Sequence, residues 1–213
     1  MSMSALSDEL AQVRTKKKEF LAQIERIVPW KEWLVLIQPC YYKGERGNKP
    51  YPLETRPRLY LLQNLYDLSD EATAAEAIDS RAFSDFCGVD SSNQVPDGDT
   101  IGRFRNLLVK NGLQEKLFAQ VVAALMKRGM ILKKGTIVDS TIISAPSSTK
   151  NKEKKRDPDA HQVKKGNQWY FSYKGHIAVD RDTGLVRKIE TTAANVHDVT
   201  QVAGLMDGTE EEL

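Results

Sequence analysis

The sequence lacks any long apolar run. Its 213 residues include no stretch that could span a bilayer as a helix, which needs roughly 18 or more consecutive apolar residues. The first nine residues, Met-Ser-Met-Ser-Ala-Leu-Ser-Asp-Glu, lack the basic and then apolar pattern of a secretory signal peptide. Only two cysteines occur, Cys40 and Cys87, so neither a disulfide framework nor a cysteine metal cluster is indicated. These absences predict a cytoplasmic protein with reduced thiols and no membrane partner.

Several classes of enzyme site are also missing from the sequence. There is no glycine-rich loop of the kind that cradles a phosphate, and no Ser-His-Asp arrangement can be read. The three histidines, His161, His176 and His197, are scattered without the spacing of zinc ligands. The chemistry of the chain must therefore be sought in its carboxylates and its basic residues.

Positive charge is concentrated in one part of the chain. The formal net charge is only +2, but residues 101–170 carry 15 basic and five acidic side chains. Much of this charge lies in a polar loop, residues 146–168, which we interpret either as a disordered insertion or as an arm that contacts DNA. Its cations are Lys150, Lys152, Lys154, Lys155, Arg156, Lys164 and Lys165. Trp169, which follows them, could stack on a base or could simply pack at the start of a strand.

The N-terminal half has the spacing of amphipathic helices. Apolar residues recur with a helical period, and proline or glycine ends each segment. We expect helices at residues 5–28, 30–37, 53–68, 70–86, 101–109 and 113–128. Two of them, separated by a turn at 95–100, resemble a helix-turn-helix whose second helix exposes Arg103 and Arg105. The alternative for these two helices is an ordinary helix pair, which any helical bundle offers. Arg56 and Arg58 point outward from helix 53–68.

Residues 135–143, Gly-Thr-Ile-Val-Asp-Ser-Thr-Ile-Ile, have the composition of a buried strand. Alternation places Asp139 on the same face as Ile137 and Ile143. An ionised carboxylate buried there costs several kcal/mol unless a partner compensates it, and a divalent cation is one such partner. The alternative is an ordinary aspartate hydrogen-bonded by a nearby turn.

The C-terminal part continues as an antiparallel sheet. Residues 170–179 and 185–193 read as strands joined by a hairpin turn at 180–184, and a helix begins at residue 195. Three antiparallel strands followed by a helix, with an aspartate inside the first strand, form the opening of an RNase-H-like fold. We therefore expect an α+β protein with a helical domain at 1–130 and the start of an RNase-H-like domain at 131–213.

Several segments, in this order along the chain, are similar to one protein family. They include the strand at 135–143, the stretch Gly-Asn-Gln-Trp-Tyr-Phe at 166–171, and Thr-Thr-Ala-Ala-Asn-Val-His-Asp at 191–198. With them, the chain resembles the transposases of bacterial insertion sequences that have an InsH-type N-terminal domain ahead of an Asp-Asp-Glu catalytic domain. The resemblance covers nearly the whole chain.

The resemblance implies a chemistry and a partner. In this family three acidic residues hold two Mg²⁺ ions, which activate the attacking oxygen and stabilise the leaving one. The result is cleavage of double-stranded DNA at terminal inverted repeats and strand transfer into target DNA. Asp139 falls on the first acidic position, residues 50–125 would bind the DNA ends, and the protein would self-associate on DNA within the nucleoid. His197 and Asp198 are candidates for an auxiliary role.

The sequence departs from the family pattern at its end. The second and third acidic residues should follow the helix that begins near residue 195, and Glu210, Glu211 and Glu212 have no strand around them. We therefore expect a C-terminally truncated transposase that binds Mg²⁺ weakly and does not cut DNA alone, with a C-terminal half of low stability. The alternative is a catalytically dead DNA-binding fragment that occupies transposon ends or inhibits an intact transposase.

Overall fold

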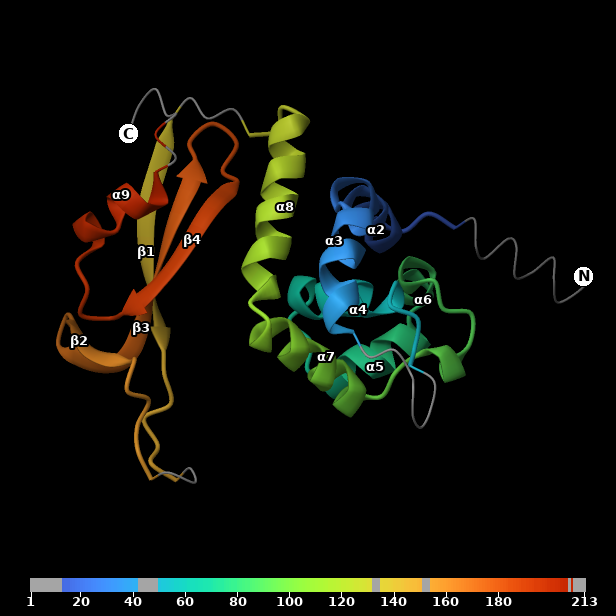
Figure 1. The fold of residues 1–213 in the computed structure, drawn as a ribbon, viewed down its shortest axis with the longest axis horizontal. Coiled ribbons are helices and arrows are strands. Elements are labelled where there is room, and N and C mark those ends of the chain that lie inside the picture. The colour runs from blue at the N-terminus through green and yellow to red at the C-terminus, as the bar shows by residue number, and fades with distance from the viewer. Residues whose placement is uncertain (1–12, 42–49, 132–134, 151–153, 207, 209–213) are drawn as a thin grey trace, which may run out of the picture. The chain divides into compact units, whose positions relative to one another are not determined.

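The chain forms two compact units. A computed structural model describes residues 13–41, 50–131, 135–150, 154–206 and 208. The units are Met1–Ala124, which is helical, and Leu125–Leu213, which contains an antiparallel sheet (Figure 1). This arrangement confirms the α+β class, and the sheet is consistent with the opening strands of an RNase-H-like domain. The units divide inside the last long helix, whereas the sequence placed the boundary after residue 130.

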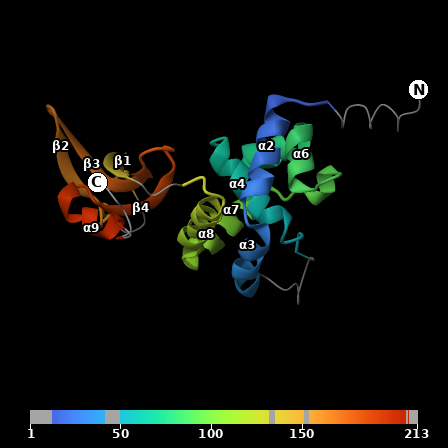
Figure 2. The same ribbon diagram turned by 90° about the horizontal axis from the view of Figure 1, so that it is seen from above.

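The helices begin and end close to their local signals. The described helices of the first unit are α2 (Lys16–Ile27), α3 (Trp30–Ile37), α4 (Thr55–Leu65), α5 (Asp70–Asp79), α6 (Arg81–Cys87), α7 (Gly98–Lys110) and α8 (Leu113–Lys127). Ser69 caps α5, because its hydroxyl accepts the amide of Ala72 at 3.1 Å. Asp97 caps α7 in the same way, accepting the amide of Thr100 at 2.7 Å. Helix α2 lies beside α6 (Figure 1 and Figure 2).

The single helix expected at 70–86 is wrong, since the structure breaks it at Ser80. That residue is extended, with φ −94° and ψ 109°, and separates α5 from α6. The break frees carbonyl groups at the end of α5. The hydroxyl of Ser84 donates to the carbonyl of Ala77 at 2.9 Å and satisfies one of them. A serine that can bond locally in this way competes with a continuous helix.

Two apolar clusters stabilise the helical unit. The first contains Leu59, Leu62 and Phe83, all at most 1% exposed, together with residues of α2 and α5. The second is built around Trp33 and Leu108. The indole of Trp33 also donates to the carbonyl of Leu117 at 3.2 Å, which ties α3 to α8. Leu59 and Leu62 lie on the buried face that the helical period of 53–68 predicts, whereas Leu65 of the same helix is 38% exposed.

Strand β3 (Gln168–Asp180) is the centre of the sheet. Strand β1 (Thr136–Ser144) pairs with it along one edge, and β2 (His161–Lys165) and β4 (Val186–Ala193) pair with successive parts of the other. All pairings are antiparallel. Among the described residues β1 pairs only with β3, so β1 lies at the edge of the sheet. The expected low stability of this half, based on such an edge, stays a prediction.

One face of the sheet is covered and the other is open. The short helix α9 (Val202–Leu205) lies against β3 and β4 (Figure 1 and Figure 2). The ammonium of Lys188 donates to the carbonyl of Gly204, so α9 covers the face that carries Lys188 and the even-numbered residues of β1 and β3. We call the opposite face, which carries the odd-numbered residues of β1 and β3, the open face.

Three expectations about the sheet need correction. Strand β1 is not buried: Ile137 is 50% and Ile143 44% exposed, because no described element covers the open face. A fourth strand, β2, forms inside the basic loop, where sequence predicted no regular structure. The helix expected from residue 195 is only a 3₁₀ turn, Asp198–Thr200, followed by α9.

None of the described helices is long and apolar enough to cross a membrane.

Candidate functional site

Asp139 lies in the middle of β1 on the open face. It is opposite Ile177 of β3, which in turn is opposite Ile189 of β4. The carboxylate is exposed, and one oxygen accepts the amide of Ser140 at 2.7 Å. The argument that burial forces Asp139 to take a cation is therefore wrong here, since water can solvate the charge. Asp139 remains available to a ligand that approaches the open face.

The described residues do not by themselves form a metal site. No group of three histidine, cysteine, aspartate or glutamate side chains lies close enough together to hold an ion within the described part of the chain. A pair of Mg²⁺ ions needs several oxygen ligands from protein, water or phosphate. Asp139 supplies one carboxylate, so the residues in view do not fit a two-ion site on their own.

A polar cluster occupies the covered face directly behind Asp139. We define it as Ser140, Lys174, His176, Thr192 and Asp198. One carboxylate oxygen of Asp198 lies 3.1 Å from the Lys174 ammonium and 3.4 Å from Nδ1 of His176. Nε2 of the fully buried His176 is 2.8 Å from the Thr192 hydroxyl. These contacts hold the 3₁₀ turn against β1 and β3, and they place Asp198 across the sheet from Asp139.

The cluster changes the titration of Asp198. Burial alone would raise its pKa, but hydrogen bonds from Lys174 and Ser140 and the charges of Lys174 and His176 lower the pKa below its ordinary value of 3.8. Neighbouring His197 is exposed, and its carbonyl accepts the amide of Thr200 at 3.1 Å. The contacts of Asp198 with Lys174 and His176 give it a structural role on the covered face. An auxiliary catalytic role for His197 and Asp198 stays a prediction.

Replacing Asp198 by asparagine should make the stability of the second unit less sensitive to a fall in pH. A carboxylate whose pKa is lowered by folding contributes stability above its unfolded pKa, and this contribution is lost as pH falls through the folded value. Wild type should therefore lose more melting temperature than Asp198→Asn between pH 7 and about pH 3. Thermal unfolding followed by circular dichroism at both pH values measures this, and equal losses would contradict the assignment.

Three of the four arginines predicted to bind DNA in the helical unit have internal partners. Arg56 is only 6% exposed, and its guanidinium donates to the Thr100 carbonyl at 3.0 Å. Arg58 forms a two-pronged ion pair with Glu25 and lies 4.3 Å from the ring centre of Trp30. These arginines fix the positions of helices and loops, a use that the outward spacing of helix 53–68 did not reveal.

The two arginines of the expected helix-turn-helix also differ, since one is paired within the protein and the other is exposed. Arg105 forms a two-pronged ion pair with Asp70 at the start of α5, with its second contact at 2.9 Å. Arg103, two positions earlier, is exposed. The connection between α6 and α7 spans residues 88–97 and is longer than a tight turn. Recognition of DNA by this helix pair therefore stays a prediction that rests on Arg103.

The basic loop presents most of its cations to solvent. We call Lys150, Lys154, Lys155 and Lys164 the arm lysines; all are exposed. Arg156 is exposed as well and lies 5.5 Å from the ring centre of Phe171. Lys152 falls outside the described residues, as does the side chain of Lys165. Trp169 is 67% exposed, so its ring does not pack in a core as the alternative for it required.

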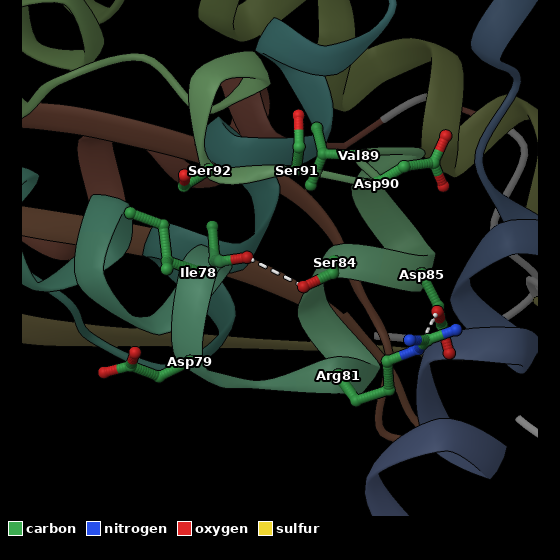
Figure 3. A pocket seen from close by; sticks show the side chains of 10 residues that line it. Ile78, Asp79, Arg81, Ser84, Asp85, Val89, Asp90, Ser91 and Ser92 are labelled. Atoms are coloured by element: carbon green, nitrogen blue, oxygen red, sulfur yellow. Dashed lines mark hydrogen bonds and ion pairs between the residues drawn. The ribbon is translucent and has the colours of Figure 1, made fainter. Parts of the chain in front are cut away.

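A hollow in the helical unit has the opposite charge. It measures about 460 Å³ and lies between the end of α5, α6 and the segment after α6 (Figure 3). Its lining includes Asp79, Asp85 and Asp90 against one cation, Arg81, whose Nε is 2.9 Å from Asp85. An acidic hollow repels a polyanion. DNA is therefore not expected to bind at this hollow.

Comparison with known families gives two matches. The model described as Transposase domain (DUF772) matches residues 8–107, and the model described as Transposase DDE domain matches residues 131–212. No solved structure matches the chain. The second match contains Asp139, the polar cluster and the basic loop.

Proposed function

Because the chain belongs to the DDE transposases of bacterial insertion sequences, we propose that it binds the terminal inverted repeats of its element. We further propose that Asp139 is the first of the acidic residues at which strand cleavage takes place. The observation that carries the proposal is the place of Asp139: mid-strand, exposed, on the open face of a sheet inside the match to the DDE domain.

The charge distribution supports DNA as the ligand. The arm lysines and Arg156 are exposed on the same unit as Asp139. Phosphate contacts by lysine and arginine supply most of the affinity for DNA and are independent of sequence. Arg103 of α7 is the exposed cation of the helical unit that we retain as a DNA contact. Target DNA and a second copy of the chain on the same DNA are further expected partners.

Mg²⁺ would supply the chemistry of strand cleavage in this family by stabilising charge on the oxygens at the scissile phosphate. Asp139 offers it one carboxylate with an oxygen free of the Ser140 contact. Mg²⁺ keeps several of its waters and is held through one or two carboxylates together with substrate phosphates. One carboxylate gives weak affinity, so we propose that residues 1–213 by themselves bind DNA without cutting it.

The binding proposal is tested with two labelled duplexes, one carrying the inverted repeat and one with its bases shuffled. Fluorescence anisotropy should show tighter binding of the inverted-repeat duplex, because base contacts add to the phosphate contacts. Equal affinity for the two duplexes would limit the function to non-specific DNA binding, and no binding of either would remove DNA as the ligand.

A nicking assay tests the catalytic part. Incubation of residues 1–213 with a supercoiled plasmid carrying the inverted repeat should give no Mg²⁺-dependent nicks above an EDTA control. The physical reason is that the described residues bring no group of three metal-ligating side chains together at Asp139. Cleavage that needs Mg²⁺ and disappears in Asp139→Asn would show that the chain has a complete site and would overturn this expectation.

A second candidate function follows from the same observations. A chain that occupies transposon ends without cutting them would inhibit an intact transposase of the same element. Such inhibition should appear as fewer transposition events when residues 1–213 are co-expressed with the intact enzyme, and a variant with neutral residues at the arm lysines should inhibit less.

A further inference from the structure

Ser140 connects the two faces of the sheet beside Asp139. Successive residues of a strand point to opposite faces, so the side chain of Asp139 lies on the open face and that of Ser140 on the covered face. The amide of Ser140 donates to one carboxylate oxygen of Asp139 at 2.7 Å. Its hydroxyl donates to the carboxylate of Asp198 on the covered face. Ser140 therefore contacts one carboxylate on each side of β1.

Side chains of β3 fix the carboxylate of Asp198. The ammonium of Lys174 lies 3.1 Å from it and also donates to the carbonyl of Val196 at 2.8 Å. Nδ1 of His176 lies 3.4 Å from the same carboxylate oxygen. This nitrogen is fully buried and has no hydrogen bond among the described residues, so the carboxylate of Asp198 is its polar neighbour. These contacts hold Asp198 without help from Ser140.

The contact between Ser140 and Asp198 lies at the level of Asp139 in the sheet. Ser140 is opposite His176 of β3, and Asp139 is opposite the next residue, Ile177. Among the described residues β1 has a backbone partner on one side only, which is β3. The side-chain contact with Asp198 is therefore a second attachment of an edge strand, made at the residue that follows Asp139.

We propose that Asp198 is a positioning residue for Asp139 and that it acts through Ser140. By holding the Ser140 hydroxyl, Asp198 fixes the direction of the Ser140 amide, and this amide selects one orientation of the Asp139 carboxylate. The inference rests on the proposed function, which gives the orientation of Asp139 its purpose. Asp198 lies on the opposite face of the sheet and does not touch the reacting atoms.

The orientation of Asp139 needs such support because its side chain is exposed. An aspartate side chain has three staggered χ1 rotamers, and an exposed one that packs against nothing exchanges among them. A hydrogen bond to an ionised acceptor is stronger than one between neutral groups, so the Ser140 amide can favour one rotamer. A displacement of about 1 Å at a reacting group can cost on the order of 100-fold in rate.

NMR of residues 1–213 at pH 7 tests the proposal through the χ1 rotamer of Asp139. Three-bond couplings from its Cγ to its backbone nitrogen and carbonyl carbon should show one predominant rotamer in the wild-type chain. Ser140→Ala should spread Asp139 over several rotamers. It should also speed hydrogen exchange of the residue 140 amide by about 10-fold, the lower end expected for a lost hydrogen bond to a charged group. Ser140→Thr keeps a hydroxyl and should restore the wild-type values.

A second set of variants tests Asp198 itself. Asp198→Ala should change the rotamers of Asp139 as Ser140→Ala does, although the two side chains lie on opposite faces. The double variant should change them no more than either single variant, because both substitutions break the same contact. If Asp198→Ala loses the dispersed spectrum of a folded sheet, the comparison of Ser140→Ala with Ser140→Thr decides the question.

Thr192→Val is the matched control. It removes a hydroxyl from the same polar cluster, where Thr192 contacts Nε2 of His176, but this hydroxyl contacts neither Ser140 nor Asp198. The control should lower the melting temperature and leave the rotamer of Asp139 unchanged. If Ser140→Ala also lowers only the melting temperature, the contact is purely structural and the inference is overturned. An equal change of rotamer in Thr192→Val would overturn it as well, because the effect would then be a general loosening of the sheet.

The outcomes separate this inference from the function on which it rests, since the rotamer is measured without DNA. If the rotamer responds as expected but neither labelled duplex is bound, the positioning contact is confirmed and the proposed function fails. If Ser140→Ala keeps the wild-type rotamer while the inverted-repeat duplex is bound specifically, the inference fails and the proposed function stands.

Discussion

Replacing the four arm lysines by glutamine should make the loss of DNA affinity between about 50 and 200 mM salt smaller than in the wild-type chain, by a factor on the order of 100. Each phosphate contact releases counterions, and the slope of log K against log salt changes by about 0.9 for each contact on duplex DNA. Four lost contacts should therefore flatten the slope by roughly 3.6. Anisotropy titrations of the inverted-repeat duplex at several salt concentrations measure this slope directly.

A second charge-matched variant makes the test specific to the loop. The control replaces four other exposed lysines by glutamine, namely Lys16, Lys31, Lys116 and Lys127. Its net charge equals that of the arm variant, so long-range attraction to DNA is reduced equally in both. The control should keep most of the wild-type slope. If both variants flatten the slope equally, the affinity reflects net charge and the loop has no special part in it.

Phe83→Ala should lower the free energy of unfolding of the helical unit by roughly 3–5 kcal/mol, the range for removing a buried phenylalanine. Phe83 is 1% exposed, and its ring centre lies 4.8 Å from that of Tyr66. The ammonium of Lys17 lies 4.5 Å from the same ring centre. Alanine would leave a cavity where α2, α4 and α6 meet, and these rigid helices can close it only in part.

Tryptophan fluorescence reports on this unit selectively. The chain has three tryptophans, and Trp30 and Trp33 both lie in α3. In a Trp169→Phe background, denaturant unfolding followed by tryptophan fluorescence therefore reads only the helical unit. Phe20→Ala is the matched control, because Phe20 also contacts Tyr66, at 6.5 Å between ring centres, but is 41% exposed. Phe20→Ala should lower the free energy of unfolding far less than Phe83→Ala does. Equal losses would show that Phe83 does not belong to the cooperative core.

The bounds of a helix were predicted well where proline marks both of its ends. Helix α3 has the bounds expected for it, because Pro29 precedes it and Pro39 follows soon after. The break at Ser80 was missed, since one serine in a helical pattern is a weak signal. Its effect depends on Ser84 meeting a carbonyl seven positions earlier, a contact that exists only after folding. Propensity alone does not contain that information.

The candidate site was predicted in part. The strand of Asp139 and its alternation are confirmed, but its exposure was not foreseen, since composition does not say which face another element covers. Strand β2 was missed because only Val163 of its five residues is apolar. Backbone pairing with β3 stabilises this strand, although its composition does not favour one. The alternation of Lys174 and His176 on β3 was the signal that could have located the polar cluster.

Outward-pointing arginines gave the least reliable prediction. Helical spacing shows which side of a helix an arginine starts from, but a long side chain can then fold onto a neighbouring element. Asp70 and Glu25 lie 35 and 33 positions from their arginine partners. A contact between such distant positions cannot be read from a local pattern, so the charge of these arginines was assigned to DNA instead.

Among the described residues no strand pairs with the second edge of β1, and this edge has a geometric consequence for the site proposed at Asp139. A strand that docks there in antiparallel register would place one of its side chains directly across from Asp139, with the two Cβ atoms about 4.5–5.5 Å apart. Two carboxylates at that spacing can share one divalent ion. Whichever strand aligns against β1, its register decides whether Asp139 gains such a companion, since a slip of one residue turns that side chain to the other face.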